Sequence, residues 1–393
     1  MIGAAIFGIP AAVTARVGAF SPLTVLAAAA GVTCVAACVA QLAARYDKSG
    51  GPYQYARAAF GEAAGGAVGW LYWMSRASSS AAVANLFMSN VSALPGMSSV
   101  PPFVIRDVLI WAAVGINLAG FRRTSGAITA LTFAKILPLL GIGVIAGAVA
   151  LSHEPVRHFP AQASALAEAI LLWVYGFAGF EAAVIPSEEA TDPRRDAPVA
   201  LYRALTIVAV LYVLLQFGIS RLWDGESPDR AVASVAASLL GPAGRGVVIF
   251  AILAAASGHL PGSVLAASRV TYGMASGGSA PAVLGRLSRR QAIPHFSIWL
   301  FGIVTWAFAI SGGFAWNATL AGGTRVIVYG VTAMAALRDD QRSDARAQVL
   351  ARWAALAFCV VLLAAQPPIR IMVVAVLGIG AWAAVTIARR RMR

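Results

Sequence analysis

The sequence predicts an all-α, polytopic membrane protein with about 12 transmembrane helices. Of its 393 residues, 59% are hydrophobic and only 12% are charged. So few charges cannot cover a water-facing surface of this size, because soluble domains carry about a quarter charged residues. The apolar residues also recur in blocks of about 20, the length that a helix needs to cross a bilayer. Helices are expected because a helix satisfies its own backbone polar groups inside lipid.

We expect a single transmembrane domain over residues 1–393, with short polar loops between the apolar blocks and no soluble domain. The expected helices are 1–18, 21–44, 62–94, 103–120, 124–151, 164–187, 198–222, 243–275, 296–312, 315–337, 349–365 and 369–388.

The net charge of +14 would suggest nucleic-acid binding in a soluble protein, but here it fits the positive-inside rule. If the chain starts in the cytoplasm and crosses at each helix, most of the 30 basic residues fall on the cytoplasmic side. With an Arg- and Ala-rich composition, this predicts a bacterial inner-membrane protein with both termini cytoplasmic and no nucleic-acid partner. Cys34, Cys38 and Cys359 lie in apolar helices, without the spacing of a disulfide framework or a metal site.

Two predicted helices contain glycine-rich interruptions, residues 3–10 in the first and residues 175–181 in the sixth. Glycine favours unwinding inside a helix. The two helices hold equivalent positions if 1–151 and 164–337 are five-helix repeats, with 349–388 as two further helices. Paired interruptions of this kind indicate a transporter's substrate site, because unwound backbone exposes N–H and C=O groups at mid-membrane. The alternative for either interruption alone is close helix packing by small residues.

Four segments resemble the amino acid–polyamine–organocation (APC) superfamily. Residues 1–10 resemble its first-helix motif, and residues 49–61 resemble its loop between the second and third helices. Residues 179–195 resemble the end of its sixth helix, and residues 268–277 the end of its eighth. The resemblance implies a LeuT-like fold, an inverted repeat of five plus five helices in which helices 1 and 6 are broken. It also implies secondary active amino-acid transport by alternating access, as a proton-coupled symporter or an exchanger.

The same resemblance assigns roles to residues of both interruptions. Backbone N–H groups of the first would bind the substrate carboxylate, and carbonyl groups of the second would bind its ammonium. Tyr175 and Phe177 lie where relatives place an aromatic gate, and Glu181 matches a carboxylate linked to gating and proton sensing. The expected substrate-binding residues are Gly3, Ala4, Ala5, Ile6, Tyr175, Gly176, Phe177, Ala178 and Phe180.

The chain departs from the family pattern in two places. Ala5 stands where the motif usually has its second glycine, and its methyl group could crowd the substrate or stiffen the interruption. The sequence also starts at the motif itself, so the first helix is expected to be truncated. We favour a start codon assigned too late over a real truncation, because residues 1–20 barely span a bilayer.

Ionisable residues inside the predicted helices are candidates for coupling and gating, since charges at that depth are costly and usually functional. Lys135, in the fifth helix, would place an ammonium near the first helix, as some APC relatives do in place of sodium; the alternative is a fixed structural cation. Arg76, in the third helix, could select an acidic substrate group or pair with Glu181 or another carboxylate. His259, in the eighth helix, could titrate during transport or form an interhelical hydrogen bond. Arg325, in the tenth helix, is similarly ambiguous.

Other functions stay open at this point. A transporter-shaped sensor or scaffold, or a truncated gene product, is favoured by Ala5 and the short first helix, whereas Glu181 and Lys135 favour transport. An enzyme is not expected, because no HExxH, GxSxG or paired membrane-aspartate motif occurs. We expect no cofactor and no metal, with a proton as the coupling ion, since Lys135 argues against sodium. The expected partners are the lipid bilayer and an amino acid, small and neutral by default; the oligomeric state is left open.

Overall fold

The computed structural model of the chain is helical throughout the part that it describes. That part comprises residues 3–46, 51–97, 99–120, 125–154, 163–181, 193–288, 293–339 and 345–366, with positions 372, 373, 376, 378–380, 383, 385 and 386. No β-strand occurs among these residues. The all-α class predicted from the sequence is therefore confirmed.

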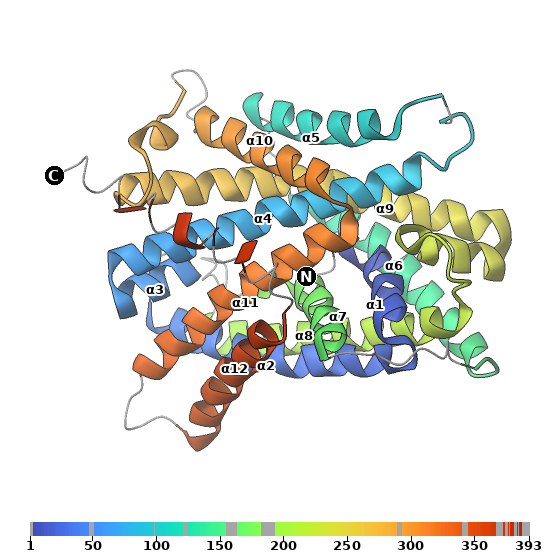
Figure 1. Ribbon diagram of the computed structural model, residues 1–393, viewed down its shortest axis with the longest axis horizontal. Coiled ribbons are helices and arrows are strands. Elements are labelled where there is room, and N and C mark those ends of the chain that lie inside the picture. The colour runs from blue at the N-terminus through green and yellow to red at the C-terminus, as the bar shows by residue number, and fades with distance from the viewer. Residues whose placement is uncertain are drawn as a thin grey trace.

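Twelve α-helices make up most of the described part. Figure 1 shows α4, α5, α9 and α10 running side by side along one side of the molecule, with α2 and α8 on the opposite side. The helices α1 and α7 lie between these groups, where α7 also packs against α11. The bounds are α1 (Ile9–Val17), α2 (Ser21–Arg45), α3 (Pro52–Phe60), α4 (Glu62–Val91), α5 (Pro102–Leu118), α6 (Ser125–Ala150), α7 (Ala163–Phe177), α8 (Pro193–Leu222), α9 (Ala231–Ser276), α10 (His295–Ser311), α11 (Phe314–Arg338) and α12 (Arg346–Ala364).

Five helical stretches of the described residues are long and apolar enough to cross a bilayer, which supports the predicted polytopic architecture. The five are Ile9–Arg45, Val199–Leu222, Pro228–Ser276, Phe314–Arg338 and Arg346–Ala364, and shorter apolar helices occupy Ile136–Ala150, Ser164–Phe177 and His295–Ser311. The count of about 12 crossings, the five-plus-five repeat and the truncated first helix stay predictions.

The predicted loop between residues 44 and 62 contains a helix, α3, that the sequence analysis missed. This helix is short and amphipathic, with Tyr53, Tyr55 and Ala56 buried. Burial raises the pKa of Tyr55 to about 12. An apolar block of membrane-spanning length was the signal for a helix, and a nine-residue amphipathic segment does not give that signal.

A second difference concerns the start of α9. The sequence predicts a helix from residue 243, whereas α9 begins at Ala231 and changes direction at Gly241. Gly241 has φ 65° and ψ −160°, a conformation that residues with a side chain rarely adopt. Pro242 follows it and lacks the N–H that would continue the helical hydrogen bonds. The Gly-Pro pair therefore separates a short leading helix from the long apolar one.

Close contacts fix α11 against its neighbours. Ser78 of α4 donates its hydroxyl to the carbonyl oxygen of Asn317 at 2.8 Å. A Cβ atom on Gly322 would lie 2.5 Å from the carbonyl oxygen of Leu171 in α7, so only glycine allows this approach. Membrane helices associate through such small residues and interhelical hydrogen bonds. As a result α11 packs closely against both α4 and α7.

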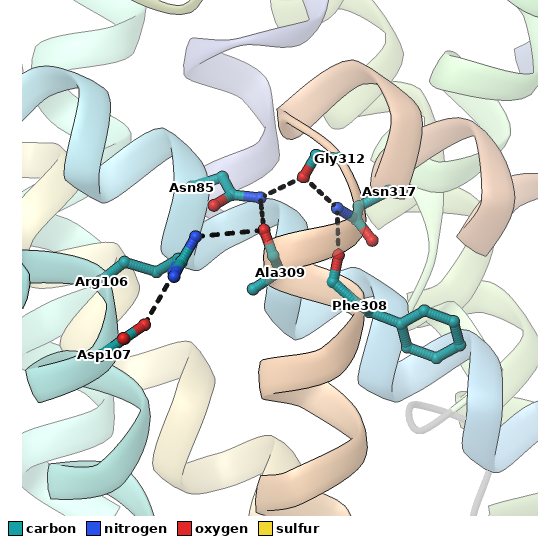
Figure 2. A network of polar contacts seen from close by, with 7 residues as sticks. All are labelled: Asn85, Arg106, Asp107, Phe308, Ala309, Gly312 and Asn317. Carbon is teal, nitrogen blue, oxygen red and sulfur yellow. Dashed lines mark hydrogen bonds and ion pairs between the residues drawn. The ribbon is translucent and has the colours of Figure 1, made fainter. Parts of the chain in front are cut away.

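The turn between α10 and α11 is held by the side chain of Asn317 (Figure 2). Its Nδ2 donates to the carbonyl oxygens of Phe308 (3.0 Å), Gly312 (2.8 Å) and Gly313 (3.1 Å). The last carbonyl groups of a helix have no partner within the helix. Asn317, which is fully buried, satisfies them inside the bundle.

Two neighbouring helices complete the same cap (Figure 2). Asn85 of α4 donates Nδ2 to the carbonyl oxygens of Gly312 at 2.7 Å and Ala309 at 3.1 Å. Arg106 of α5 reaches the Ala309 carbonyl at 3.4 Å and pairs with Asp107 at 2.8 Å. Helices α4, α5, α10 and α11 are thereby tied at one point.

Replacing Asn317 tests this cap. Asn317→Ala removes three hydrogen bonds from the end of α10, each of which is worth about 0.5–1.5 kcal/mol. We expect a clear fall in the melting temperature of the purified protein. The control is Ser311→Ala, because Ser311 donates to the same Phe308 carbonyl (2.9 Å) from an exposed side chain, so this variant removes a single hydrogen bond. Equal melting temperatures for the two variants would contradict a capping role for Asn317.

Candidate functional site

The first predicted interruption adopts an irregular backbone. Gly3 is extended (φ −103°, ψ −174°), Ala4–Phe7 form one 3-10 turn, and α1 starts only at Ile9. The side chains of this turn are buried. The first N–H groups of a helical turn have no acceptor within that turn. The N–H groups of Ala4 and Ala5 are therefore not used by the turn, although they lie inside the protein.

The second predicted interruption coincides with the end of α7. The helix stops at Phe177, and Gly179 follows with φ 102°, a left-handed conformation that favours glycine. The N–H of Gly179 donates to Oε2 of Glu181 at 2.9 Å. The last carbonyl groups of α7 are therefore outside the regular helical hydrogen bonding and lie close in sequence to the Glu181 carboxylate.

The two interruptions lie against each other. A Cβ atom on Gly176 would be 2.9 Å from Cδ1 of Ile9, so the end of α7 approaches the start of α1. Phe314 bridges the pair: its ring occupies the space where a Gly8 side chain would go, and it makes an edge contact with Tyr175 at 6.4 Å between centroids. The Tyr175 hydroxyl donates to the carbonyl oxygen of Ser79 at 3.3 Å.

One face of α8 holds both interruptions through hydrogen bonds. Tyr212 donates its hydroxyl to the carbonyl oxygen of Gly176 at 2.9 Å. One turn further along, Nε2 of Gln216 donates to Pro10 O (3.2 Å) and to Oγ1 of Thr14 (2.8 Å). The sequence analysis missed both residues, although a glutamine inside the apolar run of the seventh predicted helix was a usable signal.

A buried ion pair joins the second interruption to α11. Nη1 of Arg325 lies 3.6 Å from Oε1 of Glu181, and both side chains are about nineteen-twentieths buried. Nε of Arg325 also donates to Oγ of Ser75 at 3.2 Å, which connects the pair to α4. The sequence analysis named Arg76 as a possible partner of Glu181, but the arginine that pairs with Glu181 is Arg325.

Arg76 belongs to the same polar group by way of Tyr72. Nη1 of Arg76 contacts the Tyr72 hydroxyl at 3.3 Å, and the guanidinium groups of Arg76 and Arg325 each lie 5.8 Å from the centre of the Tyr72 ring. Within the described part of the chain, two buried atoms of this region have no hydrogen-bond partner: Oε1 of Glu181, which has only the 3.6 Å ion pair, and Nε of Arg76. Buried polar atoms are normally satisfied, so this region has capacity for a further polar partner.

Two other predicted coupling residues lie outside this group. His259 is on α9, with Nε2 3.4 Å from Oγ of Ser263. Lys135 is on α6, which packs against α8 and α9, and its side chain lies outside the described residues. No cluster of metal-binding side chains occurs in the part of the chain that the structure describes.

The contact between the interruptions can be tested at Gly176. Gly176→Val would force its side chain into Ile9, and overpacking a buried contact costs about 1–3 kcal/mol. We expect the uptake of a labelled amino acid into proteoliposomes to fall by about tenfold or more. The double variant Gly176→Val, Ile9→Ala should regain part of that uptake. Gly115→Val in α5 is the control, because a Cβ there meets no atom within 4 Å. Full uptake by the Gly176→Val protein would contradict a tight contact between the two breaks.

Comparison with known proteins agrees with this architecture. An uncharacterised transporter of Mycobacterium tuberculosis is 29% identical over 390 residues, covering 97% of this chain and 86% of that protein. The rabbit b(0,+)-type amino acid transporter 1 is 28% identical over 332 residues, 79% of this chain and 67% of that protein. The vacuolar cationic amino acid transporter 4 of Arabidopsis thaliana is 26% identical over 301 residues, 70% of this chain, which spans half of that protein's length. The profile of the amino acid permease family matches residues 1–386, so the chain belongs to the amino acid permease family, within the APC superfamily.

Proposed function

We propose that this protein is a secondary active transporter that binds an amino acid between the two helix interruptions and moves it by alternating access. The family is one of transporters and not of enzymes. The observation that carries the proposal is the contact between the broken parts of α1 and α7, both held by α8. Unwound backbone inside a helix bundle is tolerated where it lines a binding site.

The backbone would recognise the two charged ends of the substrate. The N–H groups from Gly3 to Ile6 would bind the carboxylate, favoured by the positive end of a helical turn. Carbonyl groups of Phe177, Ala178 and Phe180 would bind the ammonium. The Gly176 carbonyl already accepts a hydrogen bond from Tyr212, so Gly176 would serve through its lack of a side chain.

An aromatic gate would close over this site. Tyr175 is fixed by Ser79 and touches Phe314, which covers Gly8 of the first interruption. Phe177 packs on Tyr212 with ring centroids 5.1 Å apart. A movement of α11 would therefore displace Phe314, which contacts residues of both interruptions.

The charge of the interior favours a neutral amino acid over a cationic one. Glu181 is balanced by Arg325, whereas Arg76 forms no ion pair among the described residues, which leaves a positive charge near the second interruption. A cationic side chain there would be repelled, because like charges interact strongly in a low-dielectric interior. The names of two relatives refer to cationic or b(0,+)-type amino acid transport, so a cationic substrate is the alternative.

For coupling we propose a proton acting on Glu181, Lys135 or His259, in a symporter or an exchanger. Breaking the Glu181–Arg325 pair would free α7 from α11 as the site opens. The distribution of basic residues supports a bacterial inner membrane and cytoplasmic termini. A non-transporting sensor or scaffold, or a truncated gene product, is the competing hypothesis, favoured by Ala5 next to the substrate backbone.

Uptake into proteoliposomes tests the proposal. The panel is radiolabelled alanine, leucine, arginine and glutamate, each with and without an inward proton gradient. We expect uptake of the neutral amino acids, stimulated by the gradient, and loss of that stimulation in Lys135→Ala if this lysine couples. Correctly folded protein that takes up none of the four would favour the non-transporting alternative. Unchanged gradient dependence in Lys135→Ala would remove Lys135 from the coupling scheme.

The buried ion pair gives a second prediction. Removing one partner leaves an unpaired buried charge, at a cost of about 3–5 kcal/mol. We therefore expect Arg325→Met to lower the melting temperature sharply, and the double variant Arg325→Met, Glu181→Leu to recover most of it. If the pair is also a gate, the double variant regains stability without regaining gradient-stimulated uptake. Normal gradient-stimulated uptake by the double variant would assign the pair a purely structural role.

A further inference from the structure

A hollow of about 210 Å³ lies where α4 ends and the α8–α9 connection begins. We call it the α8–α9 hollow; the connection between α8 and α9 is at the right of Figure 1. Four charged side chains of both signs line it: Asp224, Glu226, Arg230 and Arg245. Nothing in the proposed transport site uses these residues.

The charges in the hollow do not neutralise one another. Among the described residues, none of the four takes part in an ion pair. Arg230 donates Nη2 to Oγ of Ser227 at 2.8 Å, and its Nε is buried without a described acceptor. Arg245 makes a 3.4 Å contact to the carbonyl oxygen of Ala93. Both guanidinium groups keep donors for an anionic ligand, since each carries several N–H groups in a planar fork.

The carboxylates of Asp224 and Glu226 likewise have oxygen atoms that can accept further hydrogen bonds. Oδ1 of Asp224 accepts the backbone N–H of Glu226 at 3.0 Å, which leaves its second oxygen. The Glu226 backbone carbonyl accepts Nε1 of Trp223 at 2.7 Å, so its backbone is anchored while its carboxylate is left for the hollow. An ammonium group, which offers donors only, matches these oxygens.

The wall of the hollow is held in place before any ligand arrives. Nδ2 of Asn90 donates to the carbonyl oxygen of Asp229 at 2.9 Å, which fastens the connection to α4. Ser227 has φ 36°, the one non-glycine residue with positive φ among the described residues. A strained conformation of this kind persists only where the surrounding structure enforces it. A preformed wall lowers the entropy cost of binding.

We propose that the α8–α9 hollow binds a free zwitterionic amino acid, with its carboxylate on Arg230 and Arg245 and its ammonium on Asp224 and Glu226. The volume is sufficient, because a cavity of about 150 Å³ holds benzene, which has as many non-hydrogen atoms as alanine. The inference rests on the proposed function for the class of ligand, but the site is a separate one.

The position of this site links it to transport. The 3-10 turn Pro228–Arg230, which carries the ligand-binding Arg230, packs against both α1 and α4. A ligand that draws Arg230 toward the carboxylates would shift the surface on which α1 rests. Occupancy of the hollow would therefore change the affinity of the central site, and linkage requires the reverse effect as well.

Equilibrium binding to the full chain in lipid nanodiscs tests the proposal, with radiolabelled alanine, leucine, arginine and glutamate as probes. We expect two classes of binding in the wild type, and loss of one class in Arg230→Gln through at least a tenfold weaker affinity. Glu226→Gln should weaken the same class, and its exposed side chain makes it a safe second variant for folding. The control is Arg221→Gln, since Arg221 stacks on Phe217 at 3.9 Å and does not line the hollow.

The outcomes separate this site from the transport site. Gly176→Val should remove the other binding class together with uptake, and leave the Arg230-dependent class in place. If the wild-type protein transports none of the amino acids but still shows the Arg230-dependent class of binding, the proposed function is rejected and this site is kept. A single class of binding, or an identical isotherm for Arg230→Gln and wild type, would overturn the inference. Amino-acid binding that appears only in discs without phosphatidylethanolamine would assign the hollow to a lipid headgroup and overturn it too.

Discussion

The structure depends on one constraint: backbone groups released by a broken helix must find partners inside the protein, because lipid offers none. The chain meets this constraint mainly through α8. Tyr212 takes the Gly176 carbonyl of α7, and Gln216 takes the Pro10 carbonyl of α1. Since these two residues are one helical turn apart, α8 sets the distance between the interruptions. The backbone groups that it does not occupy are those that would be left for a substrate.

A second group of contacts connects the end of α7 to the rest of the bundle. Glu181 and Arg325 pair at 3.6 Å, and Arg325 is fixed in turn by Ser75 of α4. A charge pair buried to this degree is costly to form and is therefore weak evidence of stability alone. Its value lies in position, because it joins the moving end of a broken helix to α11, which also carries Phe314. Phe314, which touches the proposed gate residue Tyr175, and Arg325 of the charge pair are thus on one helix and would move together.

Much of this arrangement could be predicted from the sequence, and the failures have a physical cause. Long apolar blocks identify membrane helices because the bilayer fixes their length, and the two glycine-rich segments lie where α1 starts and where α7 ends. The helix α3 and the start of α9 were missed since they are too short to span lipid and give no such block. The partner of Glu181 could not be predicted, because Arg76 and Arg325 are both arginines inside helices. Only the packing of α4 against α11 decides between them.

The same physics explains why side chains would contribute differently at the two proposed sites. Between the interruptions, backbone groups would bind the ends common to all amino acids, so selectivity would have to come from what surrounds them. Arg76, linked to the Glu181–Arg325 pair through Tyr72, would supply a positive field that opposes a cationic side chain. In the α8–α9 hollow, charged side chains of both signs would do the binding. A site of that kind accepts any zwitterion that fits, so it would report the total amino-acid concentration, whereas the central site selects.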